Sequence, residues 1–116
     1  MTMVYKICPA TIWQQAETAG FFAGAGIDLV DGYIHFSSVG QVAETARLHF
    51  ASQPDLVLVE VDSTAVEIVW EQSRGGQLFP HLYNRLPLSA VVSIWPLAVA
   101  ADGTHQLPQH LRPPAP

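Results

Sequence analysis

A turn, a short strand and the start of a helix are predicted by the stretch Asp31-Gly32-Tyr33-Ile34-His35-Phe36-Ser37-Ser38. Asp31-Gly32 is a turn signal, because glycine adopts the positive φ angles that tight turns need. Ser38, followed three residues later by Gln41, resembles a capping box. We therefore expect a strand over residues 33–37 and a helix N-terminus directly after it. Unpaired backbone N–H groups at such a terminus could bind a phosphate or carboxylate.

The predicted strand has two chemically different faces, because alternate side chains of a strand point in opposite directions. Ile34 and Phe36 share one face, which we expect to be buried. Tyr33, His35 and Ser37 share the other face, where a phenol, an imidazole and a hydroxyl lie side by side. This set suits the binding of a polar ligand. The alternative is that His35 is a half-buried histidine bonded to a backbone carbonyl.

The composition predicts a single soluble domain that buries much of its surface. Of the 116 residues, 49% are hydrophobic and only 13% are charged, against about 25% charged residues in an average globular chain. The net charge of −5 argues against nucleic-acid binding. The single cysteine, Cys8, excludes an intramolecular disulfide. The chain has no apolar run long enough to span a membrane and no basic leader. We therefore expect a cytoplasmic protein with a small-molecule ligand.

The hydrophobic pattern predicts an α+β domain over residues 1–108, with about five or six strands and two main helices. The first helix follows Pro9 and stops at Gly20, and the second runs from Gln41 to about Phe50. Residues 21–30 read as a glycine-containing loop, which either covers a site or only connects. Residues 109–116 read as a Pro-rich, poorly ordered tail. The expected strands cover residues 3–7, 33–37, 56–61, 66–70, 78–83 and 88–95.

Two further polar groups stand out from the apolar background. Glu71, beside Trp70, could be a carboxylate in a partly apolar pocket, although a solvated strand end is the commoner case. Arg74 lies among glycines and could bind a phosphate with its forked guanidinium, or lie free on the surface. His81, with Tyr83 and Arg85 nearby, forms the other group. Its alternative role is to pin a loop through a backbone hydrogen bond.

The sequence gives less support for a metal site, a cysteine nucleophile or a standard catalytic motif. A metal site built from His35, His81 and Glu71 is conceivable from the ligand types, but their spacing does not show that they converge. Cys8 has no partner at sequence level that would activate it, and a buried core thiol is the simpler interpretation. The chain carries no glycine-rich nucleotide motif, no nucleophile-elbow motif and no zinc-protease motif.

With these residues in view, the chain is identified as a member of a bacterial family, domain of unknown function 952. The resemblance covers roughly residues 3–108. The sequence Asp31 to Ser37, followed by Trp70-Glu71 and then Phe79-Pro80-His81-Leu82-Tyr83, is its most specific part. The matching residues also include Tyr5-Lys6-Ile7, Trp13, Ala16, Gly20 and Gln41-Val42.

The chain also resembles, more distantly, the ADP-ribosyltransferase superfamily, especially the tRNA 2′-phosphotransferases. The resemblance follows the order of Ile34-His35-Phe36-Ser37, the helix from Gln41, and the strand from Leu56 to Asp62. It implies a split, strongly curved sheet with a cleft that holds NAD in relatives. By position, His35 and Ser37 would lie at the ribose or phosphate end of this cleft, and Tyr5-Lys6 on the opening strand. Lys6 departs from the family, which usually has a ribose-binding histidine there.

Two functional hypotheses follow from this resemblance. In the first, the domain binds NAD or a related compound and transfers or hydrolyses its ADP-ribosyl group. Glu71 and His35 are then the catalytic residues, because a carboxylate stabilises the positive charge that develops on the ribose. In the second, the same cleft is a non-catalytic module that binds a nucleotide or polar metabolite. The residues expected to contact the ligand are Tyr33, Ser37, Lys6, Arg74, His81, Tyr83 and Arg85.

Overall fold

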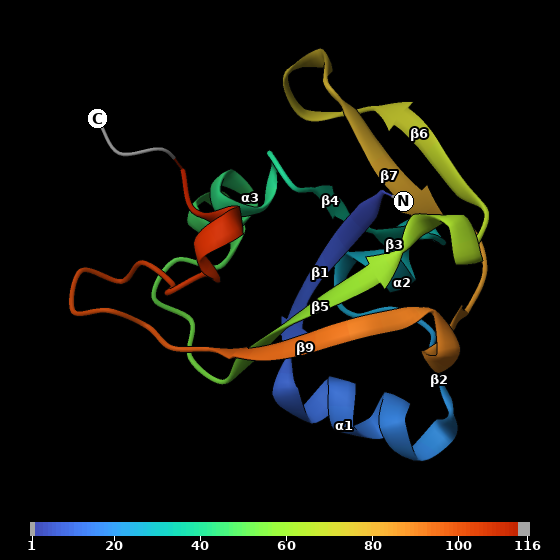
Figure 1. The fold of residues 1–116 in the computed structure, drawn as a ribbon, viewed down its shortest axis with the longest axis horizontal. Coiled ribbons are helices and arrows are strands. Elements are labelled where there is room, and N and C mark those ends of the chain that lie inside the picture. Colours follow the sequence, from blue (N-terminus) through green and yellow to red (C-terminus); the bar gives the residue numbers. More distant parts are fainter. Residues whose placement is uncertain (1, 114–116) are drawn as a thin grey trace.

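Three antiparallel sheets and three α-helices make up the computed structural model, which describes residues 2–113 and, for Arg74, the backbone only (Figure 1). The elements are, in chain order, β1 Met3–Pro9, α1 Ala10–Ala19, β2 Phe21–Phe22, α2 Ile27–Asp31, β3 Ile34–His35, β4 Ser37–Ser38, α3 Val42–His49, β5 Leu56–Asp62, β6 Ile68–Gln72, β7 Leu78–Leu82, β8 Leu86–Pro87 and β9 Val91–Leu97. Short 3-10 helices are η1 Ser63–Ala65, η2 Arg74–Gly76, η3 Leu88–Ala90 and η4 Gln109–Leu111.

The largest sheet has the strand order β4-β1-β5-β9. Its two central strands pair over their full length, from Met3 opposite Asp62 to Pro9 opposite Leu56. Both faces of this pair are covered, so β1 is buried from Val4 to Cys8 and its sequence shows no polar face apart from Lys6. The prediction of a central strand at residues 56–61 agrees with β5.

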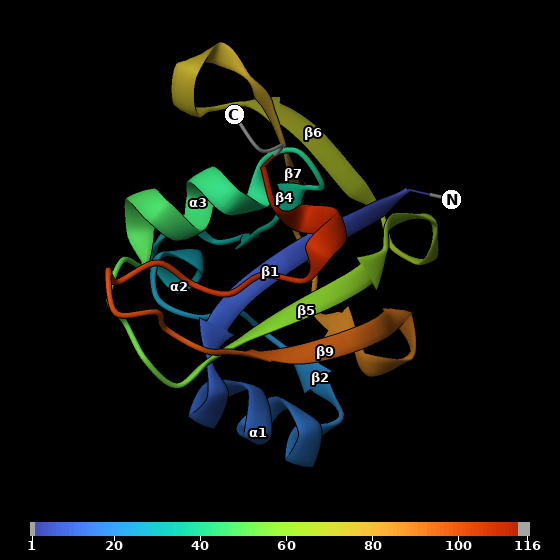
Figure 2. The same cartoon turned by 60° about the vertical axis from the view of Figure 1, so that its left-hand side comes forward.

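The second sheet, β3-β7-β6, is joined to the first by residues 34–38. Figure 2 shows β4 of the first sheet beside β7 of the second. The strand expected over residues 33–37 is divided at Phe36, whose backbone N–H donates to the carbonyl of Pro80 at 2.9 Å. On one side of Phe36 the chain pairs with β7, and on the other side it pairs with β1. Residues 34–38 therefore belong to two sheets in succession.

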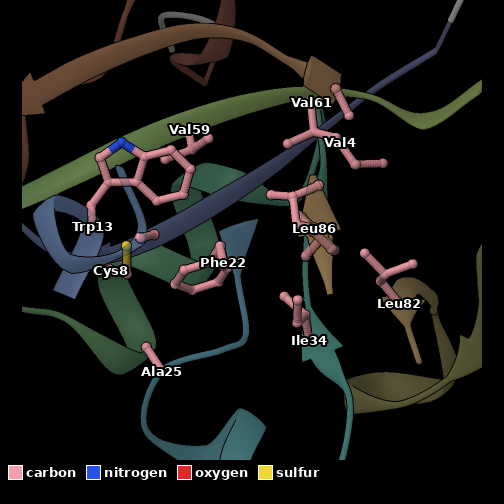
Figure 3. Packing of buried hydrophobic residues seen from close by; sticks show 13 residues of the cluster. Val4, Cys8, Trp13, Phe22, Ala25, Ile34, Val59, Val61, Leu82 and Leu86 are labelled. Carbon is pink, nitrogen blue, oxygen red and sulfur yellow. The ribbon is translucent and has the colours of Figure 1, made fainter. Parts of the chain in front are cut away.

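A hydrophobic cluster covers each face of the large sheet. One cluster contains Val4 and Cys8 from β1, and Figure 3 shows side chains from α1, β5 and the two smaller sheets meeting them. Ile34 and Phe36 belong to this cluster, at 2% and 3% exposure, as their shared strand face predicts. The other cluster contains Tyr5 and Ile7, covered by α3 and by the C-terminal residues Leu107 and Leu111.

The structure corrects several sequence-based boundaries. Over residues 2–113 there are nine strands rather than about five or six, because four of them are two-residue ladders that carry no periodic signal. The expected loop at 21–30 contains β2 and the five-residue helix α2. The helix expected from Gln41 begins one residue later, at Val42. The Oε1 of Gln41 accepts from the N–H of Ser38 at 2.9 Å, which is one of the two contacts of the predicted capping box.

The C-terminal segment returns to α3 (Figure 1). Of the Pro-rich stretch 109–116, residues 114–116 lie outside the described residues. The described part forms η4 and buries Leu111 at 3% exposure. Within residues 2–113, each helix is too short or too polar to cross a lipid bilayer.

Candidate functional site

Aromatic and imidazole rings stack on one face of the three-stranded sheet, from β3, from β7 and from the residues next to these strands. His35 lies opposite His81 in the strand register, and their ring centroids are 5.2 Å apart. Tyr33, two residues before His35, and Tyr83, two residues after His81, point to the same side as the histidines, and their ring centroids lie 4.9 Å apart. The Tyr33 ring also lies 4.5 Å from the His35 ring and 4.4 Å from the His81 ring. Tyr33 therefore covers both imidazoles, and His81 is only 3% exposed.

A carboxylate from the neighbouring strand β6 completes this group. Glu71 Oε1 accepts a hydrogen bond from the Tyr83 hydroxyl at 2.6 Å and lies 2.8 Å from His81 Nδ1. The hydrogen bonds from Tyr83 and then from His81 lower the pKa of Glu71, so its carboxyl stays anionic at neutral pH. The bond to Glu71 in turn raises the pKa of Tyr83 to about 12. We call Tyr33, His35, Glu71, His81 and Tyr83 the Tyr–His cluster.

A buried aspartate on α2 holds the His35 side of the cluster. Asp28 is 2% exposed, and its Oδ1 lies 2.6 Å from His35 Nδ1 and accepts from the His35 backbone N–H at 3.0 Å. Its Oδ2 lies 2.6 Å from Lys6 Nζ and accepts from the backbone N–H of Ala25 at 2.9 Å. Each carboxylate oxygen of Asp28 thus has two partners. Lys6 also donates to the carbonyl of His35 at 3.0 Å.

Asp28 stays charged despite its burial. Desolvation raises the pKa of its carboxyl, but the charge of Lys6 and the hydrogen bonds from Lys6, Ala25 and His35 outweigh that effect, and the net shift is downward. On the opposite edge of the imidazole, Asp31 Oδ2 lies 3.0 Å from His35 Nε2. His35 is therefore clamped between two carboxylates, one buried and one at the surface.

Asp28 was not among the site residues predicted from the sequence. It lies in a segment that the glycines marked as a loop, and nothing local connects it with Lys6 or His35, which come from two different strands. The one available signal was its charge in an apolar segment, in a chain where 13% of the residues are charged. A charge in such a setting is a candidate for a buried pair.

The other predicted site residues do not belong to the stacked rings of the Tyr–His cluster, although Lys6 bonds to the backbone of His35. Lys6 is 7% exposed and pairs with Asp28, and it also lines a separate hollow of about 420 Å³ between β1, α1 and α2. Ser37 is buried and its hydroxyl lies 2.9 Å from that of Thr45 on α3. The guanidinium of Arg85 lies 4.4 Å above the ring of Phe21. Arg74 lies on η2, and its side chain is outside the described part of the chain.

Two hollows flank the cluster along β7. One, of about 190 Å³, is lined by Tyr33, Tyr83 and Asp28, among others. The other, of about 350 Å³, is lined by Ser37, Phe79 and residues of α3 and the β6–β7 loop. Phe79, His81 and Tyr83 alternate along one face of β7, so His81 lies between the two hollows. The second hollow falls within the usual size of ligand pockets, roughly 300–1,000 Å³.

Among the described residues, the imidazoles and carboxylates of the cluster do not converge as metal ligands would. Within residues 2–113, no three His, Cys, Asp or Glu side chains are grouped so that they could hold a metal ion. The Nδ1 atoms of His35 and His81 each face a carboxylate at hydrogen-bond distance. This arrangement suits fixing and orienting the two imidazoles.

Comparison with known proteins gives a family and a close structural relative. No curated protein matches the sequence. The crystal structure of protein CC0527 from Caulobacter crescentus is 43% identical, covers 95% of this chain and 98% of its own, and superposes with a TM-score of 0.90. Its solution NMR structure gives 42% identity, 91% and 93% coverage and a TM-score of 0.78. Residues 7–94 match the model of one family, so the chain belongs to the family described as protein of unknown function (DUF952).

Proposed function

We propose that the Tyr–His cluster binds an ADP-ribosyl compound, with NAD as the first to test, and cleaves the bond between its ribose and nicotinamide. The observation that carries this proposal is the fixed carboxylate of Glu71, held by Tyr83 and His81 beside the ring of Tyr33. The resemblance of residues 34–37 and of the following helix and strand to the ADP-ribosyltransferase superfamily supports the choice of ligand.

The chemistry of the cluster suits this bond. The nicotinamide of NAD is a cationic ring, which an aromatic face such as that of Tyr33 or Tyr83 attracts. When the C1′–N bond breaks, its electron pair goes to the nicotinamide nitrogen and the ribose becomes a cation. The Glu71 anion stabilises that developing charge. Water then adds to C1′ and releases a proton, so the products are nicotinamide, ADP-ribose and H⁺.

The rest of the ligand would extend toward the hollow of about 350 Å³, where Ser37 and Ser73 supply hydroxyl groups. Arg74 follows Ser73 directly in the chain and is the candidate cation for the pyrophosphate. Arg85 is less suited, because its guanidinium is stacked on Phe21. His35, clamped by Asp28 at Nδ1, would orient a ribose hydroxyl through Nε2 once the exposed Asp31 carboxylate turns away, with Tyr33 beside it.

The test measures nicotinamide release from NAD by chromatography, and NAD binding by calorimetry. We expect Glu71→Gln to reduce turnover about a hundredfold or more while changing affinity little, because the carboxylate acts mainly on the transition state. His35→Ala should weaken both. Glu67→Gln is the matched control, since Glu67 is exposed and precedes the same strand. Wild-type turnover by Glu71→Gln excludes Glu71 as the catalytic group.

A non-catalytic binding module is the second candidate. It is favoured by Lys6, which stands where the catalytic relatives usually have a histidine and is locked to Asp28 at 2.6 Å. This candidate predicts that NAD or another ADP-ribosyl compound raises the melting temperature without being consumed. A bound ligand at a hundredfold excess over its Kd stabilises a fold by about 2.7 kcal/mol, which a thermal shift detects.

A further inference from the structure

We propose that the hollow between α3 and the C-terminal segment is a second binding site, for a small organic anion with an apolar chain, such as a medium-chain carboxylate. This hollow has a volume of about 680 Å³. Its size is within the roughly 300–1,000 Å³ of ligand pockets. It lies on the α3 side of the large sheet and does not include any residue of the Tyr–His cluster.

One wall of the hollow is apolar. Ala43 and Ala46 of α3 and Ala51, just beyond the helix, face Leu107 and Pro113 of the C-terminal segment. Alanine side chains leave space where larger residues would fill it, and the wall offers no polar groups to a bound chain. An alkyl chain placed there is removed from water, which contributes about 0.8 kcal/mol for each buried CH₂.

The charged groups at the hollow are mainly cationic. Arg47 and Arg112 line it, although the whole chain has only five Lys and Arg and a net charge of −5. Asp102 is the one acidic residue in the lining, and its Oδ1 already accepts from the backbone N–H and the hydroxyl of Thr104. Two of the five Lys and Arg side chains therefore line one mostly apolar hollow. An apolar wall with cationic groups beside it suits an anion that carries an apolar chain.

The two arginines are available for a ligand in different ways. Arg112 donates from Nε to the carbonyl of Leu107 at 2.7 Å, which positions the guanidinium and leaves its terminal N–H groups for a carboxylate. Arg47 makes only a 3.7 Å contact with Glu44, and both side chains are mostly exposed. Such a surface pair is worth little, so Arg47 can turn toward an anion at low cost.

The other wall of the hollow, formed by residues 102–106, is fixed by hydrogen bonds to the segment before β5. Residues 98–106 form a narrow hairpin that is bonded to the segment before β5, through Ser52 N–H to the Gly103 carbonyl at 2.9 Å and through the ring of His105 to the Gln53 carbonyl at 2.8 Å. A Cβ on Gly103 would collide with the Ser52 hydroxyl. A hollow bounded by such fixed contacts is formed before the ligand arrives, which lowers the cost of binding.

The experiment titrates the ¹⁵N-labelled full chain with octanoate and follows its amide resonances by NMR. The matched probes are 1-octanol, which has the chain without the charge, and acetate, which has the charge without the chain. We expect octanoate to shift residues of α3 and of 102–107, and to bind more tightly than either probe. Arg112→Gln and Arg47→Gln should each weaken octanoate by about tenfold, the usual effect of losing one charge-assisted hydrogen bond.

Two further variants complete the design. Ala43→Leu fills the hollow and keeps both arginines, so it should abolish the octanoate shifts while the protein remains folded. Arg85→Gln removes a cation from another part of the surface and should leave octanoate binding unchanged. The proposal is overturned if octanoate shifts no localised set of residues, if octanol binds as tightly as octanoate, or if Arg85→Gln weakens binding as much as Arg47→Gln.

Discussion

Asp28 and His35, which come from different elements, meet with their Oδ1 and Nδ1 atoms 2.6 Å apart inside the protein. The same carboxylate neutralises Lys6, the one basic residue that the large sheet buries among the described residues. One aspartate therefore connects the centre of the large sheet to the imidazole at the edge of the Tyr–His cluster. The stability of the fold and the geometry of the candidate site depend on the same side chain.

Replacing this aspartate should destabilise the protein strongly. Asp28→Asn keeps the shape of the side chain but leaves the charge of Lys6 buried without a counter-ion, which typically costs roughly 3–5 kcal/mol. Urea unfolding followed by circular dichroism measures the change. Glu17→Gln, an exposed change on α1, is the control and should stay within about 0.5 kcal/mol of the wild type. A similarly small effect of Asp28→Asn would show that the pair contributes nothing to stability.

Stability should fall in acid, with Asp28 as a main cause. The pKa of its carboxyl is lower in the folded protein than its ordinary value of 3.8. Its contribution is therefore fully present above pH 3.8 and is lost as the pH falls through the folded pKa, because the unfolded chain binds the proton more readily. Urea unfolding at a series of acidic pH values should show this decline. The decline should be shallower in Asp28→Asn, and an equal slope in both proteins would assign it to other carboxyls.

The titration of Tyr83 should report on Glu71. The hydrogen bond to Glu71 is the largest cause that raises the pKa of Tyr83 to about 12. Glu71→Gln removes the charge of the acceptor, so the pKa of Tyr83 should move down toward the ordinary value of 10.0. NMR of ¹³C-labelled tyrosine rings follows this titration, with Glu67→Gln as the control. An unchanged Tyr83 pKa in Glu71→Gln would mean that the two side chains are not paired in solution.

The close approach of the C-terminal hairpin to Ser52 should be sensitive to one methyl group. Gly103 has a φ of +86°, which residues with a Cβ rarely adopt, and a methyl group there would also displace the Ser52 hydroxyl, so Gly103→Ala should cost roughly 1–3 kcal/mol. Gly40→Ala is the matched control, because Gly40 has an ordinary φ and a methyl group there would meet no other atom within 4 Å. Thermal unfolding of the two variants compares them. Equal melting temperatures would show that the hairpin contact yields without strain.

The sequence predicted the parts of this architecture that depend on short-range periodicity. The alternation of residues 33–37 placed Ile34 and Phe36 in the core and put Tyr33 beside His35, since a strand has only two faces. The pairing of Glu71 with His81 was not predicted, because it depends on the register of the β6–β7 hairpin. That register is set by the hydrophobic pattern together with the geometry of the turn, and the sequence between the two strands did not predict which turn forms.

The partner of Lys6 was likewise not predictable from the local sequence. The resemblance placed Lys6 on the opening strand, where the family usually has a histidine, and its pairing with Asp28 was not predicted. A charge in a strand gives no sign of its partner when the partner lies more than twenty positions away in a segment without strong periodicity. The number of strands was underestimated for a related reason, because a two-residue ladder is too short to show a period.

The division of residues 34–38 between two sheets limits how this protein can change over evolution or in the laboratory. A deletion of one residue here would reverse the alternation beyond it, so that the rings of the cluster and the aliphatic core residues would exchange sides. The change would damage the core and the candidate site at once. Substitutions can be accepted here one side chain at a time, but a change of length cannot, and libraries that vary loop length in this protein should leave this segment intact.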